Sequence, residues 1–228
     1  LILSVNKDKD IAVENLKKYK NIENVKRVFE ISKAKAEAES RYLGLKGTQI
    51  NLYQKILGYI LFDNPVRPKQ IKKLNISNFS QSDLWKYGIS GDLQIILVKI
   101  RDSNDIYVIK QVLQMYEFFR SKNLKIDLIF LDEETHSYEN YVKEEIESQI
   151  LDRHLGFLKN VKGGIHVLSK NELPKKDLNL LNFISAFTID THNGDLKHLI
   201  FDQEEEYFAS LQNVPDEYYD EIIEETNS

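Results

Sequence analysis

Three adjacent carboxylates follow the apolar run at residues 126–131, which predicts a buried β-strand. They are Asp132, Glu133 and Glu134. Ligands usually bind at the carboxyl ends of the strands in an open α/β sheet, and carboxylates there could hold Mg²⁺ or act as general acid and base. Acidic residues leading into a helix are also common because they are solvated and complement the helix dipole. Both interpretations stay open, although glycoside chemistry would further need two carboxyl groups across a cleft.

A second group of polar and aromatic residues surrounds the turn Gly88-Ile89-Ser90-Gly91-Asp92. A phosphate-binding glycine loop follows a strand and opens a helix, whereas these glycines precede a strand, so a close backbone approach to a neighbour or a sugar fits better. Aromatic rings beside polar groups are typical of sugar-stacking sites, with packing in the core or between domains as the alternative. The candidate carbohydrate contacts are Trp85, Tyr87, Ser90, Asp92, Asp132 and Glu133.

Other residue types with catalytic or metal-binding chemistry are sparse. The five histidines show no HxH or HxxxH spacing, no serine lies in a nucleophile elbow, and the chain has no cysteine. We therefore assign no catalytic residue and expect neither a metal site nor a cofactor. The lack of cysteine fits a reducing compartment, so we expect a cytoplasmic location.

Charge is unevenly distributed along the 228 residues. All 31 Lys and Arg residues lie at or before Lys197 and ten of the 36 acidic residues follow it, so the body carries +5 and the tail −10. The body has no dense basic stripe, so we expect no nucleic acid partner. No apolar run approaches the roughly 20 residues that span a bilayer, so we expect no direct membrane insertion. The acidic tail, residues 201–228, could remain solvated or dock on a partner.

The elements that position these residues form two patterns. The run at 1–5 predicts a strand already under way, as in a piece of a longer protein, and the periodicity from Asp8 to Leu43 predicts two helices. Asn21 is a plausible N-cap of the second, and a third helix is expected from Thr48. Pro65 and Pro68 forbid its continuation, so we expect a helical connector over residues 9–78.

Residues 79–200 alternate between strand and helix. Strands are predicted at 93–100, 126–131 and 165–168, with helices after each. This alternation calls for right-handed crossovers and a mainly parallel sheet of three or four strands. The fold class is thus α/β: a helical connector followed by a small three-layer module.

Three stretches resemble one family. Residues 84–100, LWKYGISGDLQIILVKI, resemble the segment LW(R/A)HGISGDLPIVLVRI of cyclic β-1,2-glucan synthases. Residues 116–133, YEFFRSKNLKIDLIFLDE, are similar to heYWRlKGLkvDLVILNE of that family, and residues 163–168, GGIHVL, look like its GGVFVL. Residues 41–45 and 59–63 resemble the helical stretch that precedes them, in the same order.

The resemblance implies a very large, inner-membrane-associated parent with a glucosyltransferase, a cyclising transglycosylase and a module similar to glycoside phosphorylases. It places this region between those catalytic parts and implies that residues 1–8 end a preceding β-sandwich. None of the family's catalytic residues falls in the matched motifs. Gln94 replaces Pro, Asn123 replaces Gly, and Asp132 replaces Asn, which puts a role for an Asn-Glu pair in doubt.

Three hypotheses follow. The first is a non-catalytic accessory segment that positions the parent's other domains or contacts β-1,2-glucan. The second is a small carbohydrate-active enzyme, which requires Asp92, Asp132 and Glu133 to meet in one concave pocket. The third is a truncated module whose acidic tail binds a partner protein.

Overall fold

The computed structural model describes residues 3–62, 80–102, 105–134 and 141–200, except residues 192, 193, 195 and 199 in the last range. The chain divides into two compact units, Leu1–Ile50 and Asn51–Ser228. The predicted end of the connector and the acidic tail lie outside the described residues, so the division into connector, module and tail stays a prediction.

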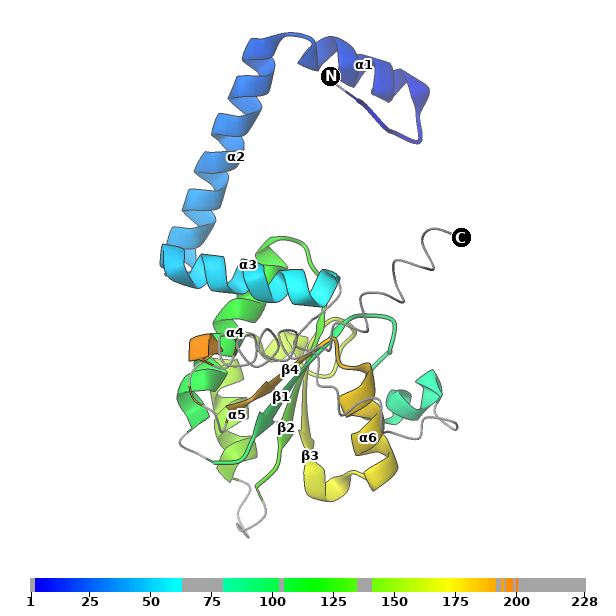
Figure 1. The fold of residues 1–228 in the computed structure, drawn as a ribbon, viewed down its shortest axis with the longest axis vertical. Coiled ribbons are helices and arrows are strands. Elements are labelled where there is room, and N and C mark those ends of the chain that lie inside the picture. Colours follow the sequence, from blue (N-terminus) through cyan, green and yellow to red (C-terminus); the bar gives the residue numbers. More distant parts are fainter. Residues whose placement is uncertain are drawn as a thin grey trace, which may run out of the picture. The chain divides into compact units, whose positions relative to one another are not determined.

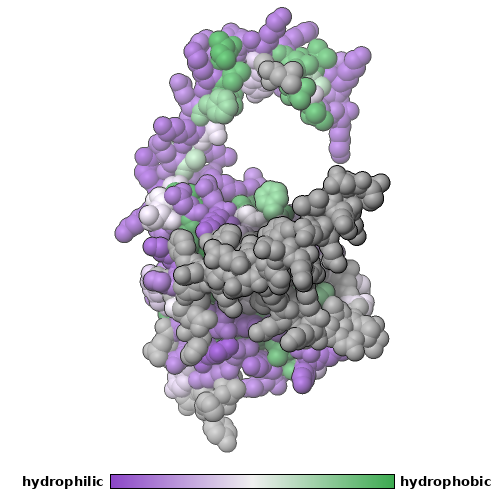
Figure 2. Space-filling model, viewed as in Figure 1, coloured by the Kyte–Doolittle hydropathy of each residue, from purple (hydrophilic) through white to green (hydrophobic). Residues whose placement is uncertain are grey.

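The first unit contains the two helices predicted between Asp8 and Leu43, which are α1 (Lys9–Tyr19) and α2 (Ile22–Tyr42). Asn21 caps α2 as expected, because its side chain accepts a hydrogen bond from the Glu23 amide. Neither helix contains a buried residue, and Figure 2 shows apolar side chains exposed along both. Residues 3–6 carry no regular secondary structure, so the strand expected at 1–5 is not formed by its described part.

From Asn51 onward, helix α3 (Gly47–Leu61) belongs to the second unit. Its buried residue Tyr53 donates a hydrogen bond from its hydroxyl to the carbonyl of Gln111, at 3.3 Å. Tyr59 stacks on Phe187, with ring centroids 6.2 Å apart. The third predicted helix therefore packs directly on the elements that follow.

The second unit is built on a four-stranded parallel sheet in the order β3-β2-β1-β4 (Figure 1). The strands are β1 (Ile95–Ile100), β2 (Asp127–Asp132), β3 (Ile165–Ser169) and β4 (Phe187–Asp190). The helices that join them are α4 (Ile106–Ser121), α5 (Tyr141–Asp152) and α6 (Lys175–Ile184). The predicted α/β class is confirmed, and every strand pair is parallel.

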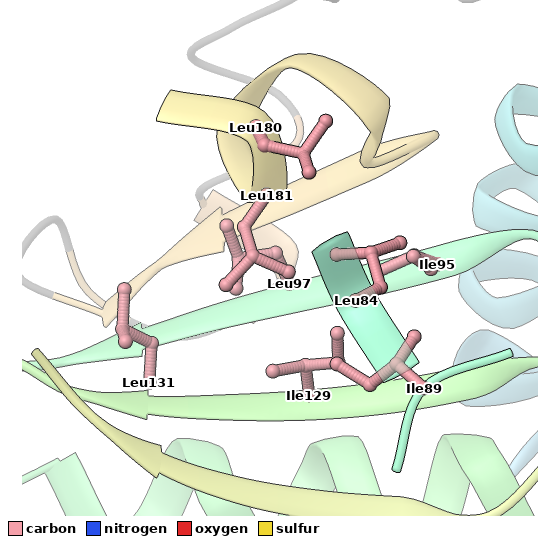
Figure 3. Packing of buried hydrophobic residues seen from close by; sticks show 8 residues of the cluster. All are labelled: Leu84, Ile89, Ile95, Leu97, Ile129, Leu131, Leu180 and Leu181. Atoms are coloured by element: carbon pink, nitrogen blue, oxygen red, sulfur yellow. The ribbon is translucent and has the colours of Figure 1, made fainter. Parts of the chain in front are cut away.

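Both faces of the sheet are covered, which makes three layers. Helices α4 and α5 lie on one face, and α6 lies on the other together with the 3₁₀ helix η2 (Gln81–Tyr87) (Figures 1 and 3). Leu84 of η2 and Leu181 of α6 meet Leu97 and Ile129 of the sheet in this second layer (Figure 3). Because both faces are buried, β1 and β2 have the nearly continuous apolar sequences that parallel strands need.

The order of the strands creates one topological switch point. From β1 the chain passes through α4 and α5 toward the β3 edge, and it then returns over the opposite face through α6 to place β4 on the other side of β1. In doubly wound sheets, ligands bind at the carboxyl ends of the two strands between which the direction reverses. That position here lies between β1 and β4.

No helix in the described ranges is long and apolar enough to cross a membrane.

Candidate functional site

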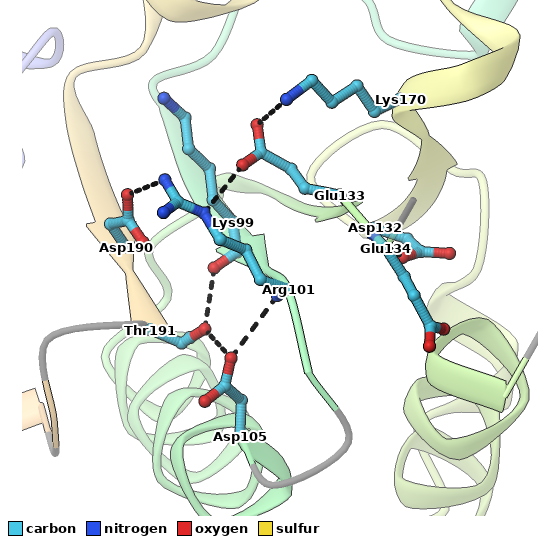
Figure 4. A network of polar contacts seen from close by, with 9 residues as sticks. All are labelled: Lys99, Arg101, Asp105, Asp132, Glu133, Glu134, Lys170, Asp190 and Thr191. Carbon is cyan, nitrogen blue, oxygen red and sulfur yellow. Dashed lines mark hydrogen bonds and ion pairs between the residues drawn. The ribbon is translucent and has the colours of Figure 1, made fainter. Parts of the chain in front are cut away.

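At the switch point, Arg101 joins three strand ends (Figure 4). Arg101 follows β1 directly, and its Nε donates to Glu133 Oε2 at 3.1 Å while its Nη2 donates to Asp190 Oδ2 at 2.7 Å. Glu133 follows β2 and Asp190 ends β4. Lys170, just after β3, adds an ammonium 3.3 Å from Glu133 Oε1. The carboxyl ends of all four strands are thus tied together by ion pairs.

A second set of contacts closes the same edge. The hydroxyl of Thr191, the residue after β4, lies 2.9 Å from the Lys99 carbonyl and also contacts the carboxylate of Asp105. Asp105 further accepts a hydrogen bond from the Arg101 amide at 3.4 Å. Burial lowers the pKa of Lys99, although the nearby Glu133 and Asp190 oppose that shift. The position where a doubly wound sheet usually binds a ligand is therefore occupied by cross-linking side chains.

The three adjacent carboxylates of the sequence diverge. Glu133 turns toward Arg101 and Lys170, whereas Asp132 and Glu134 point away from it (Figure 4). Asp132 is buried, which raises its pKa, and the amide of Glu134 donates to its Oδ1 at 2.9 Å and partly offsets that rise. Asp132 and Glu133 therefore do not face each other across a cleft.

The turn from Trp85 to Asp92 lies at the opposite end of the sheet, because it precedes β1. The six residues of β1 span about 20 Å at the usual rise for a parallel strand. Asp92 forms an ion pair with Lys162, with Oδ2 and Nζ 2.5 Å apart. The structure therefore places Asp92 far from Asp132 and Glu133, and the single pocket that the enzyme hypothesis requires is not formed by these three residues.

The two candidate aromatic residues have different environments. The side chain of Trp85 is exposed, with a residue accessibility of 63%, and its indole Nε1 donates to the Ser90 carbonyl at 3.3 Å. Ser90 in turn accepts at Oγ from the amide of Asp92, at 3.3 Å. These contacts hold an exposed ring against the backbone of the turn that carries Ser90 and Asp92, so packing in the core does not explain Trp85.

Tyr87 instead anchors η2 to α6. Its hydroxyl donates to Asp177 Oδ2 at 2.6 Å, and the ammonium of Lys86 donates to the same oxygen at 2.5 Å. Burial and the hydrogen bond to Asp177 raise the pKa of Tyr87. Burial alone would raise the pKa of Asp177, but the hydrogen bonds from Lys86 and Tyr87 outweigh it and lower that pKa. Tyr87 therefore anchors the end of η2, and with it the turn that follows, to α6.

Sequence reasoning missed the partners that define both ends of the sheet. They are Arg101 and Asp190 at the carboxyl end, and Asp177 and Lys162 at the amino end. Arg101 and Asp190 are 89 positions apart. Arg101 follows a predicted strand, but Asp190 ends β4, which the sequence did not predict, so no signal in the sequence indicated this contact. Asp177 resembles an ordinary acidic residue in a first helical turn.

Metal coordination gains no support within the described ranges, where no three His, Asp or Glu side chains are grouped closely enough to hold an ion. The cofactor expectation stays a prediction.

The fold defines the chain's second unit as an α/β domain with a doubly wound parallel sheet. No family model matches the chain. A stretch of 114 residues, half of the chain, is 23% identical to the cyclic beta-(1,2)-glucan synthase NdvB of Rhizobium meliloti (strain 1021). The match covers 4% of that protein's length. This similarity indicates a weak relationship to a glucan synthase and supports a glucan-related role only loosely.

Proposed function

We propose that this chain is a non-catalytic segment of a larger protein similar to cyclic glucan synthases, where it contacts β-1,2-glucan and positions neighbouring domains. The observation that carries the proposal is the exposed, hydrogen-bonded indole of Trp85. It lies in the stretch of residues 84–100 that resembles the glucan synthase family. In this proposal the parent is associated with the inner membrane and the chain acts in the cytoplasm.

The geometry of the turn suits a sugar. A pyranose presents a face of C–H groups that stacks on an aromatic ring, while its hydroxyls need hydrogen-bond partners at the ring's edge. Trp85 offers the ring, and Ser90 and Asp92 offer polar groups beside it. Lys162, paired with Asp92, adds an ammonium donor at the same place.

The support beneath the turn is rigid, as a binding surface requires. Leu84 and Ile89, on either side of Trp85 in sequence, are buried in the layer beneath α6. Gly88 is the C-cap of η2 and has φ 73°, a left-handed conformation that most side chains disfavour. A glycine at this position lets the chain turn sharply at the end of η2. The ring of Trp85 is therefore held on a fixed base with little conformational entropy to lose on binding.

Two further observations support the non-catalytic and positioning parts of the proposal. At the carboxyl edge, Glu133 is committed to ion pairs with Arg101 and Lys170, which removes a free general base. In the first unit, α2 exposes large apolar side chains such as Phe29 and Ile31, which suits packing against another part of a larger protein.

Trp85 is the chain's single tryptophan, so intrinsic fluorescence reports on this site alone. Titration with β-1,2-glucooligosaccharides should shift the emission and protect the indole from acrylamide quenching. By calorimetry, Trp85→Ala should weaken binding about 2- to 12-fold if sugar stacking contributes as much as an aromatic pair.

Tyr107→Ala is the matched control, since Tyr107 is 60% exposed but lies at the start of α4, toward the opposite end of the sheet. It should leave the affinity unchanged. No heat and no fluorescence change at millimolar oligosaccharide would overturn the glucan contact, as would equal weakening by both variants.

A further inference from the structure

A basic pocket of about 250 Å³ lies at the amino end of the sheet, between the turn that leads into β2 and the loop that leads into β3. Its lining residues are Arg120, Asn123, Leu124, Lys125, Leu158 and Lys162. The three charged members of this lining are all cations. Nothing in the glucan proposal uses Arg120, Asn123 or Lys125.

The walls of this basic pocket are fixed to each other by buried contacts. The Gly163 carbonyl accepts from the hydroxyl of Tyr116 at 2.6 Å and from Nη1 of Arg120 at 3.3 Å. The Gly163 amide donates to Oδ1 of the buried Asp127 at 2.6 Å. The loop that carries Lys162 is thereby tied to α4, which carries Arg120, so the backbone of both walls and the Arg120 guanidinium are positioned before any ligand arrives.

The positive charge of the pocket is only partly neutralised. Lys162 pairs with Asp92 at its rim. Among the residues that the structure describes, no carboxylate pairs with Arg120 or Lys125. Arg120 also lies over the Tyr116 ring, 5.9 Å from its centroid, which orients its guanidinium. Placing like charges around one hollow costs energy that a bound anion would recover.

We propose that this pocket binds the phosphate group of a small soluble phosphate monoester. A guanidinium matches two oxygens of a tetrahedral anion, ammonium groups add point charges, and the amide of Asn123 can donate a further hydrogen bond. The volume lies just below the range of about 300–1,000 Å³ typical of drug-sized ligands, which favours a phosphate with at most one sugar. The pocket shares Lys162 with the proposed glucan surface, but it does not include Trp85.

Isothermal calorimetry of the full chain with inorganic phosphate and with glucose 6-phosphate tests the proposal. Both should bind, and unsubstituted glucose should not. Lys125→Gln and Lys162→Gln should each weaken binding about five- to tenfold, while Asp92→Asn, which releases Lys162, should strengthen it about two- to threefold. The matched control is Lys110→Gln, an exposed α4 lysine about 15 Å along the helix from Arg120, which should change nothing.

Three outcomes would overturn the proposal. They are the absence of binding at millimolar phosphate, equal losses in Lys110→Gln and Lys125→Gln, and binding only to vesicles that contain phosphatidic acid. Trp85→Ala should retain phosphate binding, so failure of the glucan proposal and failure of this one are distinguishable. Thermal denaturation confirms that each variant is folded, and phosphate should raise the melting temperature of the native chain but not of the Lys125→Gln/Lys162→Gln double variant.

Discussion

Replacing Asp177 by Asn tests how the turn that carries Trp85 is held on the domain. Asp177 is buried, with a side chain 4% exposed, and a single oxygen accepts hydrogen bonds from Lys86 and Tyr87. Hydrogen bonds to a charged group contribute about 1.5–3 kcal/mol each, but half of the Lys86 side chain remains in water and Tyr87 can still donate to the Asn carbonyl. We therefore expect Asp177→Asn to lower the free energy of unfolding by about 1.5–2 kcal/mol.

The pH dependence of this loss has a definite sign. The pKa of Asp177 is lowered in the folded chain, below its ordinary value of 3.8. A carboxylate with a lowered folded pKa contributes stability above its unfolded pKa, and that contribution disappears as the pH falls through the folded value. The difference between the native chain and Asp177→Asn should therefore be complete at neutral pH and shrink below about pH 4.

Urea unfolding followed by Trp85 fluorescence and by far-ultraviolet circular dichroism measures this effect. Tyr87→Phe is the companion variant, expected to cost about 1 kcal/mol, and the double variant should lose less than the sum of the two because they share one contact. Equal urea midpoints for the native chain and Asp177→Asn at neutral pH would refute the reasoning. If the difference in urea midpoint between the native chain and Asp177→Asn persisted unchanged in acid, the stabilisation would not come from the ionised carboxylate of Asp177.

Three further substitutions test the packing and the electrostatics of the second unit. A Cβ on Gly164 would lie 2.2 Å from the Leu158 carbonyl oxygen, so Gly164→Ala should lower the free energy of unfolding by about 3 kcal/mol or more. Gly58 has open space around it in α3, so Gly58→Ala should raise the free energy of unfolding by about 0.5–1 kcal/mol. Similar urea midpoints for these two variants would contradict the predicted clash. Burial raises the pKa of Asp132, so the charged form of this side chain destabilises the folded chain once the pH exceeds that pKa. Asp132→Asn should therefore raise the urea midpoint at neutral pH but not in acid. A lower midpoint at neutral pH would show that the charged form of Asp132 makes a stabilising contact.

Much of the fold was predictable because its signals are local. Strands β1, β2 and β3 are apolar runs bounded by turn residues, and helices α2 and α4 follow apolar periodicity after an Asn or Asp cap. Strand β4 has only four residues, and two of them are half-buried, so no run marks it. Its conformation depends on pairing with β1, from Ile96 to Lys99, about 90 residues earlier.

The candidate site was predictable only in part. The sequence indicated that Trp85, Ser90 and Asp92 share one turn, and the structure agrees. It could not separate the exposed Trp85 from the anchoring Tyr87, because that difference depends on Asp177, 90 positions away. Adjacency also suggested that Asp132 and Glu133 act together, but successive side chains at a strand end point to opposite sides.

The sequence by itself determined the α/β class, the alternation of strands and helices from β1 to α6, the absence of cysteine chemistry and the placement of acidic residues after a strand. Each of these follows from composition or from apolar spacing within one element. Only the tertiary structure decided which strand ends meet, that Asp92 pairs with Lys162, and that Arg101 fills the switch point. Those facts depend on strand order and on contacts between residues far apart in the chain, whose energies no local pattern records.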